Sequence, residues 1–191
     1  MGEDYFTNPI IFLIQVVIGT FALFAMLRFL LQAVKADFYN PLSQFIIKIT
    51  NPILNPLRKI IPNLGRIDIA SIIIVWLLLA IEAILILIIL KREFEILNIF
   101  IMTFPEVLSL LIDIFIYGII IQAILSWVNP GSYNPALQIL YELNKPILHP
   151  IRKFIPAMSG IDITPIIAIV GLYLLQMLLI PPLQKILLNL I

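Results

Sequence analysis

Few side chains in this sequence could carry out chemistry. Cysteine is absent and histidine occurs once, at His149, so thiolate chemistry and a histidine metal cluster are both excluded. The sequence contains no glycine-rich phosphate loop, no His-Glu-x-x-His and no nucleophile motif in a plausible setting. Two basic pairs follow prolines at the same spacing: Arg58-Lys59 and Arg152-Lys153. Two carboxylates, Glu82 and Asp113, interrupt long apolar runs. We therefore expect no enzymatic activity, no metal and no cofactor.

The composition is that of a membrane protein. Of 191 residues, 62% are hydrophobic and 12% are charged, whereas soluble domains contain about 45–50% apolar and about 25% charged residues. A soluble fold of this size could not bury so much apolar surface in one core. The formal net charge is only +1, so we expect no direct contact with nucleic acid.

Four segments are long enough to span a bilayer, which requires about 20 apolar residues. They cover about 9–34, 69–90, 107–128 and 164–180. A short apolar stretch, 94–106, is predicted to lie at the interface rather than to span. Pro181-Pro182 is predicted to end or kink the last span. Asn-Pro pairs are predicted to start helices, with asparagine as N-cap and proline in the first turn; they begin at Asn8, Asn40, Asn51, Asn129 and Asn134.

The chain repeats itself at an offset of 94 residues. Residues 39–73 align with 133–167 without a gap, and 17 of the 35 positions are identical. The identities include a structural motif of prolines and one aspartate: Pro52, Pro56, Pro62 and Asp68 in the first copy, and Pro146, Pro150, Pro156 and Asp162 in the second. Each copy (1–93 and 107–191) is therefore span, connector, span. Because each copy has two spans, both enter the membrane in the same direction, as a parallel repeat.

The connectors, 40–62 and 134–156, lie on one side of the membrane. Eight of the twelve Lys and Arg residues fall in or beside them, against three on the opposite side. Cytoplasmic loops collect Lys and Arg, so we expect cytoplasmic connectors and both termini outside.

The connectors have the pattern of amphipathic interfacial segments. Apolar residues recur at helical spacing, as in Leu42, Phe45, Ile46 and Ile49. Such segments would present Arg58, Lys59, Arg152 and Lys153 to lipid phosphates or to a protein partner. The structural alternative is that these cations only set topology and snorkel.

The acidic residues also allow two interpretations. Asp68 and Asp162 directly precede spans, where a carboxylate caps the helix and can pair with a nearby arginine. Because Pro165 has no N–H, Asp162 is expected to reach Thr164. Glu82 and Asp113 are candidates for a proton or ion relay, but their repeat equivalents are Gln176 and Gly19, which predicts that neither belongs to the repeated chemistry. Arg28 is expected to snorkel toward the connector side.

The Pro-x-x-x-Pro-x-Arg-Lys-x-x-Pro segments at 52–62 and 146–156, each followed by a glycine and an aspartate, resemble the bacterial YggT family, called YlmG in plastids and cyanobacteria. The resemblance covers nearly the whole chain. It implies a small inner-membrane protein with two such repeats, connected with osmotic and envelope stress, with cell division and, in plastids, with cytochrome assembly. It implies no settled biochemical activity.

Two hypotheses of function follow. The first is a non-enzymatic membrane scaffold or assembly factor whose connectors bind anionic lipid, or a division or envelope protein. The second is a channel or transport component formed by a homo-oligomer, with Glu82 and Asp113 as its working residues. Four helices leave little room for a pore in one copy, so this second function would require self-association.

Overall fold

The computed structural model describes residues 3–61, 67–128, 134–155 and 162–189, and this part of the chain is built from α-helices. The helices are α1 (Glu3–Ala33), α2 (Pro41–Arg58), α3 (Ile69–Ile89), α4 (Ile96–Val128), α5 (Pro135–Phe154) and α6 (Thr164–Leu188). Four of them, α1, α3, α4 and α6, are long and apolar enough to cross a membrane. The predicted all-α, four-span membrane architecture is therefore confirmed.

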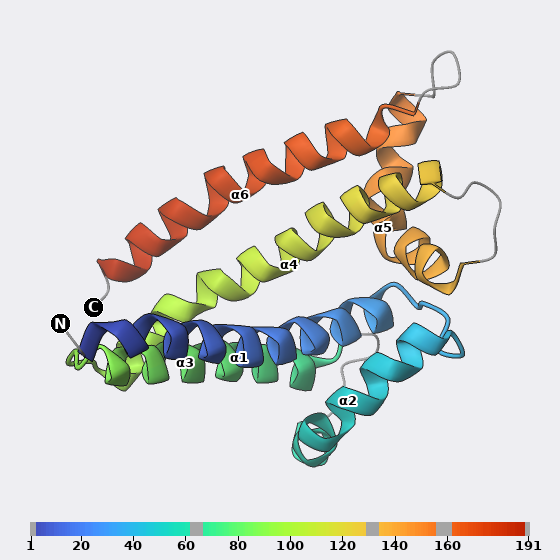
Figure 1. Cartoon of the computed structure of the whole chain (residues 1–191). Helices are drawn as coiled ribbons and strands as arrows, with labels where there is room; N and C mark the ends of the chain where they lie inside the picture. Colours follow the sequence, from blue (N-terminus) through green and yellow to red (C-terminus); the bar gives the residue numbers. More distant parts are fainter. Residues whose placement is uncertain (1–2, 62–66, 129–133, 156–161, 190–191) are drawn as a thin grey trace.

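The spanning helices form two hairpins. Helix α1 packs on α3 within the first repeat and α4 packs on α6 within the second, while α3 and α4 join the repeats. Both chain ends lie at one end of the molecule, and the connector helices α2 and α5 lie at the other (Figure 1). The repeats are therefore parallel, as expected. Among the described helices, α1 and α6 do not contact each other, so the four spans form an open arrangement rather than a closed bundle.

The first repeat packs around small residues on α1. Ala22 and Ala25 are almost fully buried against α3 and α4, with the larger Met26 of α1 and Val75 of α3 in the same cluster. Small side chains allow the helix backbones to approach closely, which matters in a bilayer because lipid tails are as apolar as leucine.

The stretch 94–106 does not form a segment separate from the third span, and in this respect the prediction was wrong. Residues from Ile96 onward form the first turns of α4, which continues through Pro105 to Val128. The indole of Trp76 on α3 lies edge-on to the rings of Phe100 and Phe104, and its Nε1 donates to the Phe100 carbonyl at 2.9 Å. These contacts hold the first turns of α4 against α3.

The Asn-Pro prediction succeeds at the connectors and fails elsewhere. The side chains of Asn40 and Asn134 each accept from the amide two residues later at 2.9 Å, and so cap α2 and α5. In contrast, Asn8 and Asn51 lie inside α1 and α2, and no helix starts there. Asn129 lies outside the described residues.

Prolines bend helices here more often than they end them. Pro52 and Pro56 lie inside α2, and Pro146 and Pro150 inside α5; in Figure 1 both connector helices change direction along their length. Likewise α6 continues through Pro181 and Pro182 to Leu188, so the predicted end near residue 180 was wrong. The carbonyls that lose partners there lie in the C-terminal part of α6, near the end of the span, where water can replace the missing N–H groups.

Candidate functional site

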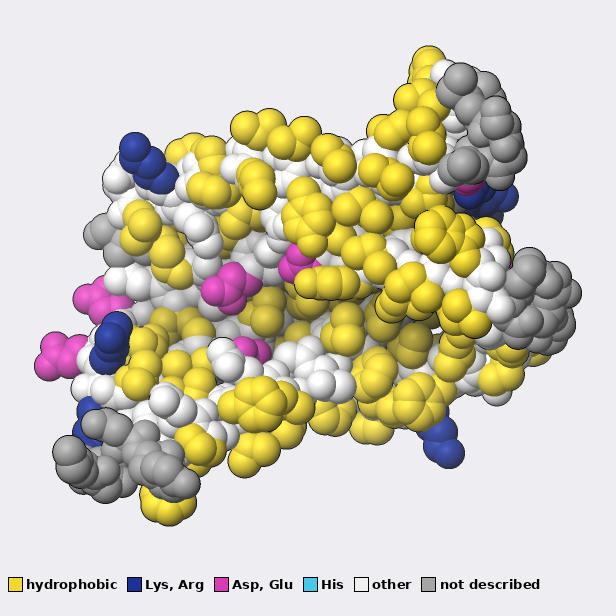
Figure 2. All heavy atoms as spheres, turned by 45° about the horizontal axis from the view of Figure 1, so that its top comes forward, with side chains coloured by type: hydrophobic (Ala, Val, Ile, Leu, Met, Phe, Trp, Pro, Cys, Tyr) yellow, Lys and Arg dark blue, Asp and Glu magenta, His cyan; other side chains and the backbone are white. Residues whose placement is uncertain are grey.

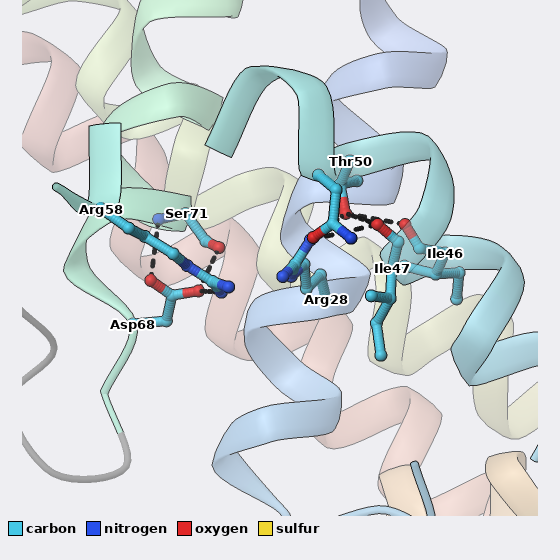
Figure 3. Close-up of polar contacts among 8 residues, drawn as sticks. Arg28, Ile46, Ile47, Thr50, Arg58, Asp68 and Ser71 are labelled. Atoms are coloured by element: carbon cyan, nitrogen blue, oxygen red, sulfur yellow. Dashed lines mark hydrogen bonds and ion pairs between the residues drawn. The ribbon is translucent and has the colours of Figure 1, made fainter. Parts of the chain in front are cut away.

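The first repeated polar contact ties the end of each connector helix to the start of the next span. Asp68 is fully buried at the N-terminus of α3, where its carboxylate accepts from the amide and the hydroxyl of Ser71, the latter at 2.6 Å. Arg58 Nη2, at the end of α2, donates to Asp68 Oδ2 (Figure 3). Burial alone would raise the pKa of the Asp68 carboxyl, but the hydrogen bonds from Arg58 and Ser71 outweigh it and hold this pKa below its usual value.

The second repeat builds the same contact at a more exposed place. Arg152 Nη2 and Nε donate to Asp162 Oδ2 at 2.9 and 3.2 Å, and the Thr164 amide donates to Asp162 Oδ1 at 2.9 Å. This is the amide that the sequence singled out, because Pro165 cannot donate. Burial favours the neutral acid here too, yet the hydrogen bonds of Thr164 and the charge of Arg152 keep the pKa of Asp162 lowered.

These two ion pairs change the interpretation of the Arg-Lys pairs at 58–59 and 152–153. Arg58 and Arg152 were expected to face lipid or a partner, but each is bound to the aspartate ten residues later and positions a connector helix. Lys59 and Lys153 remain exposed. Pro62 and Pro156, the last prolines of the motif, lie outside the described residues.

A second repeated contact, which the sequence analysis missed, ties each connector helix to the preceding span. Arg28 of α1 is buried and its Nη1 donates to Thr50 Oγ1 at 2.7 Å, to Asn51 Oδ1 at 2.8 Å and to the Ile47 carbonyl at 3.3 Å, all in α2 (Figure 3). Arg28 therefore points toward the connector side, as expected, but it binds α2 instead of reaching solvent.

The equivalent contact in the second repeat is neutral. Adding 94 to Arg28 and Thr50 gives Gln122 and Asn144, and Asn144 Nδ2 donates to Gln122 Oε1 at 2.8 Å with both residues buried. The signal was available in the sequence, because the two pairs align at the repeat offset. The contact could not be recognised from this alignment alone, because the sequence does not show that the two positions of each pair face each other.

The two acids inside the spans lie near equivalent positions of the two repeats. An ideal Cβ on Gly19 would lie 3.9 Å from Glu82 Oε2, and Gln176 Nε2 donates to Asp113 Oδ1 at 2.9 Å. Positions 19 and 82 are the repeat equivalents of 113 and 176. Each repeat thus places one carboxylate between its two spans, from α3 in the first and α4 in the second. The acids themselves are not repeated, because the equivalents of Glu82 and Asp113 are Gln176 and Gly19.

Asp113 also lines a groove between the repeats. The groove has a volume of ≈ 570 Å³; α1 and α4 form its sides, and Leu140 and Leu143 of α5 close one end. Apolar side chains cover nearly all of its surface. Figure 2 shows a hollow across this mainly apolar face with a few acidic side chains in and beside it. Within the described residues, no group of three or more His, Cys, Asp or Glu side chains is placed to hold a metal ion.

Comparison with known proteins agrees with the internal repeat. The family model for CCB3/YggT matches twice, over 7–89 and 101–183, and these ranges differ by the same 94 residues. An uncharacterized protein of Pseudomonas aeruginosa is 44% identical over 89% of this chain and 87% of its own length. The Escherichia coli K12 protein named "Uncharacterized protein YggT" is 38% identical over 89% and 88%, and an uncharacterized Vibrio alginolyticus protein is 35% identical over 86% and 90%. No solved structure matches. The chain is therefore a multi-pass membrane protein of the CCB3/YggT family.

Proposed function

We propose that this protein is a non-enzymatic scaffold of the bacterial inner membrane that binds anionic lipid through its connector helices, α2 and α5. The observation that carries the proposal is that polar contacts fix both connectors at the same end of the spans, while their lysines and several apolar side chains remain exposed. The ion pairs of Arg58 and Arg152 and the contacts of Arg28 and Gln122 supply that fixation.

The exposed surface of the connector helices suits a lipid headgroup layer. Phe45 is 52% exposed and Tyr141 is 43% exposed, and Phe154 ends α5 with 85% of its surface accessible. Aromatic rings of this kind insert at the level of the headgroups. Lys48, Lys145 and Lys153 are exposed on the same helices, and Lys59, directly after α2, is exposed as well. A lysine near an anionic membrane surface contributes about 1 kcal/mol to binding.

Lipid retention tests the proposal. The purified protein is exposed to mixed micelles of phosphatidylglycerol and phosphatidylcholine, and the bound lipids are counted by native mass spectrometry. A variant with glutamine at the four connector lysines (Lys48, Lys59, Lys145 and Lys153) should lose most of its preference for phosphatidylglycerol. A matched variant with glutamine at Arg92 and Lys185, at the opposite end, should keep it. Unchanged preference in the four-lysine variant would remove the lipid proposal and favour a protein partner for this surface.

The proposed orientation has its own test. Because the chain has no cysteine, single cysteines can be introduced without a background signal. A cysteine at Lys59 or Lys153 should react with an impermeant maleimide only after the cells are opened, whereas one at Lys185 should react in intact cells. The reverse pattern would place the connectors outside.

The groove between the repeats supports a second candidate function, that of a transport component. Asp113 lies in the groove within a spanning helix, and carboxylates in such places mark ion or proton pathways in many transporters. The open arrangement of the spans would require oligomers to enclose a path. Proteoliposomes should then show a cation or proton flux that Asp113→Asn and Glu82→Gln abolish; absence of flux at every oligomeric state would exclude this function.

A further inference from the structure

A second hollow lies at the corner where the first span meets its connector. It has a volume of ≈ 510 Å³ and is lined by residues that precede α2 or belong to it: Phe38, Pro41, Gln44, Phe45, Ile47, Lys48 and Asn51. We call it the α2 pocket. It is open on one side and lies at the end of the spans, the depth at which phospholipid headgroups sit.

The polar half of the α2 pocket offers hydrogen-bond donors. Lys48 contributes an ammonium group, and Gln44 contributes an amide. The amide oxygen of Asn51 already accepts from Arg28 at 2.8 Å, so the NH₂ group of Asn51 is the half left for another molecule. Arg28 also donates to the carbonyl of Ile47, a second lining residue, at 3.3 Å. The guanidinium charge therefore lies directly behind the pocket wall and adds to that of Lys48.

The apolar half matches the other part of a phospholipid. Phe38 and Phe45 are each about half exposed, and Pro41 lies between them in the sequence. Rings at this depth can pack against the glycerol and the first methylene groups of an acyl chain while the phosphate binds to the donors.

The second repeat lacks the charge that this pocket has. The equivalents of Arg28, Lys48 and Asn51 are Gln122, Glu142 and Lys145. The first set carries two positive charges, whereas in the second set the acid and the lysine cancel. Furthermore, Glu142 Oε2 accepts from the Asp37 amide at 2.8 Å, so this side chain binds α5 to the turn between α1 and α2. Among the described residues, the charges beside the α2 pocket are therefore not repeated in the second copy, although the fold is duplicated.

We propose that the α2 pocket binds one anionic phospholipid, with the headgroup phosphate held by Lys48 and Asn51 and the glycerol region packed against Phe38 and Phe45. This inference rests on the proposed lipid-binding function and narrows it to one stoichiometric site. It differs from general attraction to an anionic surface, in which every connector lysine counts equally.

Two single substitutions distinguish a specific lipid site from general attraction to an anionic surface. Lys48→Gln removes the pocket ammonium, and Lys145→Gln removes an exposed lysine of α5 whose position is equivalent to Asn51. Native mass spectra at increasing phosphatidylglycerol should show one lipid that binds more tightly than the rest to the wild-type protein and to Lys145→Gln. In Lys48→Gln the affinity for this first lipid should fall about tenfold. Lys48→Glu, which copies the second repeat, should abolish the preference for it.

Three results would overturn the inference. If Lys48→Gln and Lys145→Gln weaken the first lipid equally, the pocket is not a special site, although the connectors still bind anionic lipid. If the wild-type protein retains phosphatidylcholine as well as phosphatidylglycerol, both the pocket and the proposed function fall together. If inorganic phosphate displaces the first lipid at equal concentration, the pocket recognises a free anion and not a lipid. Thermal unfolding of each variant, followed by tryptophan fluorescence, verifies that binding is compared between folded proteins.

Discussion

The two Arg–Asp ion pairs occupy equivalent positions in the two repeats, and we expect them to contribute different amounts to stability. In the first pair the Asp68 side chain is fully buried and that of Arg58 is 23% exposed. In the second pair the side chains of Arg152 and Asp162 are 43% and 37% exposed. The two pairs therefore allow the effect of burial to be compared within one chain, at equivalent positions of the repeat.

The magnitude follows from solvent screening. Removing one partner of a buried pair costs about 3–5 kcal/mol, because the other charge is left unpaired; exposed pairs contribute about 0–1 kcal/mol. Since Arg58 retains some contact with solvent, we expect Asp68→Asn to lower the free energy of unfolding by about 2–3 kcal/mol. Asp162→Asn should lower it by about 0.5 kcal/mol. Asparagine caps helices nearly as well as aspartate, so the difference isolates the charge.

The assay is unfolding by sodium dodecyl sulfate in mixed micelles, followed by tryptophan fluorescence. Double-mutant cycles with Arg58→Gln and Arg152→Gln give the coupling energy of each pair. A coupling of similar size in both repeats, or a larger one at Asp162, would refute the reasoning that burial decides the value of these contacts.

Three further predictions use the same unfolding assay. Gly118→Ala should cost about 1–2 kcal/mol, because its new Cβ would lie 3.2 Å from a buried amide oxygen of α5; Gly171→Ala, with no atom within 4 Å, should be neutral or stabilise by up to about 1 kcal/mol. Arg28→Gln should cost about 2 kcal/mol, and adding Thr50→Asn should recover about half, because the double change builds the neutral pair of the second repeat; a double variant less stable than the single one would contradict this. Because the pKa of Asp68 is lowered on folding, its contribution is fully present above the unfolded value of 3.8 and is lost as the pH falls through the folded value; acid titration should show this loss in the wild-type protein and not in Asp68→Asn.

The large features of the fold could be predicted because their signals are long. A span needs about 20 apolar residues, and four runs of about this length can be recognised in the sequence. The repeat extends over 35 aligned positions, and its identical prolines and aspartates distinguish it from a chance match between apolar segments. Local rules were reliable at Asn40 and Asn134, where asparagine, proline and an amphipathic helix coincide.

The same local rules failed where packing outweighed them. Asn51-Pro52 reads as a helix start, yet Arg28 binds both Thr50 and Asn51, and this contact lies in the middle of α2. A proline inside a helix costs about 3 kcal/mol or more, and no property of the neighbouring residues reveals that a distant arginine helps to offset it. The stretch 94–106 was misread for the same reason, because its partner, Trp76, lies on another helix.

The role of the basic motif could not be decided from the sequence. Arg58 and Arg152 precede exposed lysines, and an Arg-Lys pair beside a span is usually solvated. Whether the arginine reaches lipid or the aspartate ten residues later depends on the angle between the connector and the next span. That angle is set by contacts such as those of Arg28 and Gln122, which the sequence places far from the motif.

The two repeats differ at the equivalent positions 48 and 142, and this difference gives the two connectors different contacts. Glu142 accepts from the Asp37 amide, and Asn40 Nδ2 donates to the Pro135 carbonyl at 2.9 Å. Both contacts join the segment that leads into α2 to α5. A lysine at 142, as at the equivalent position 48, could not accept from an amide, so the connectors would lose one of these ties. Conversely, a glutamate at 48 would leave the buried charge of Arg28 facing an acid instead of a site for an anion. One repeat therefore uses this position to hold the connectors together, while the other leaves a basic pocket open to the headgroup layer.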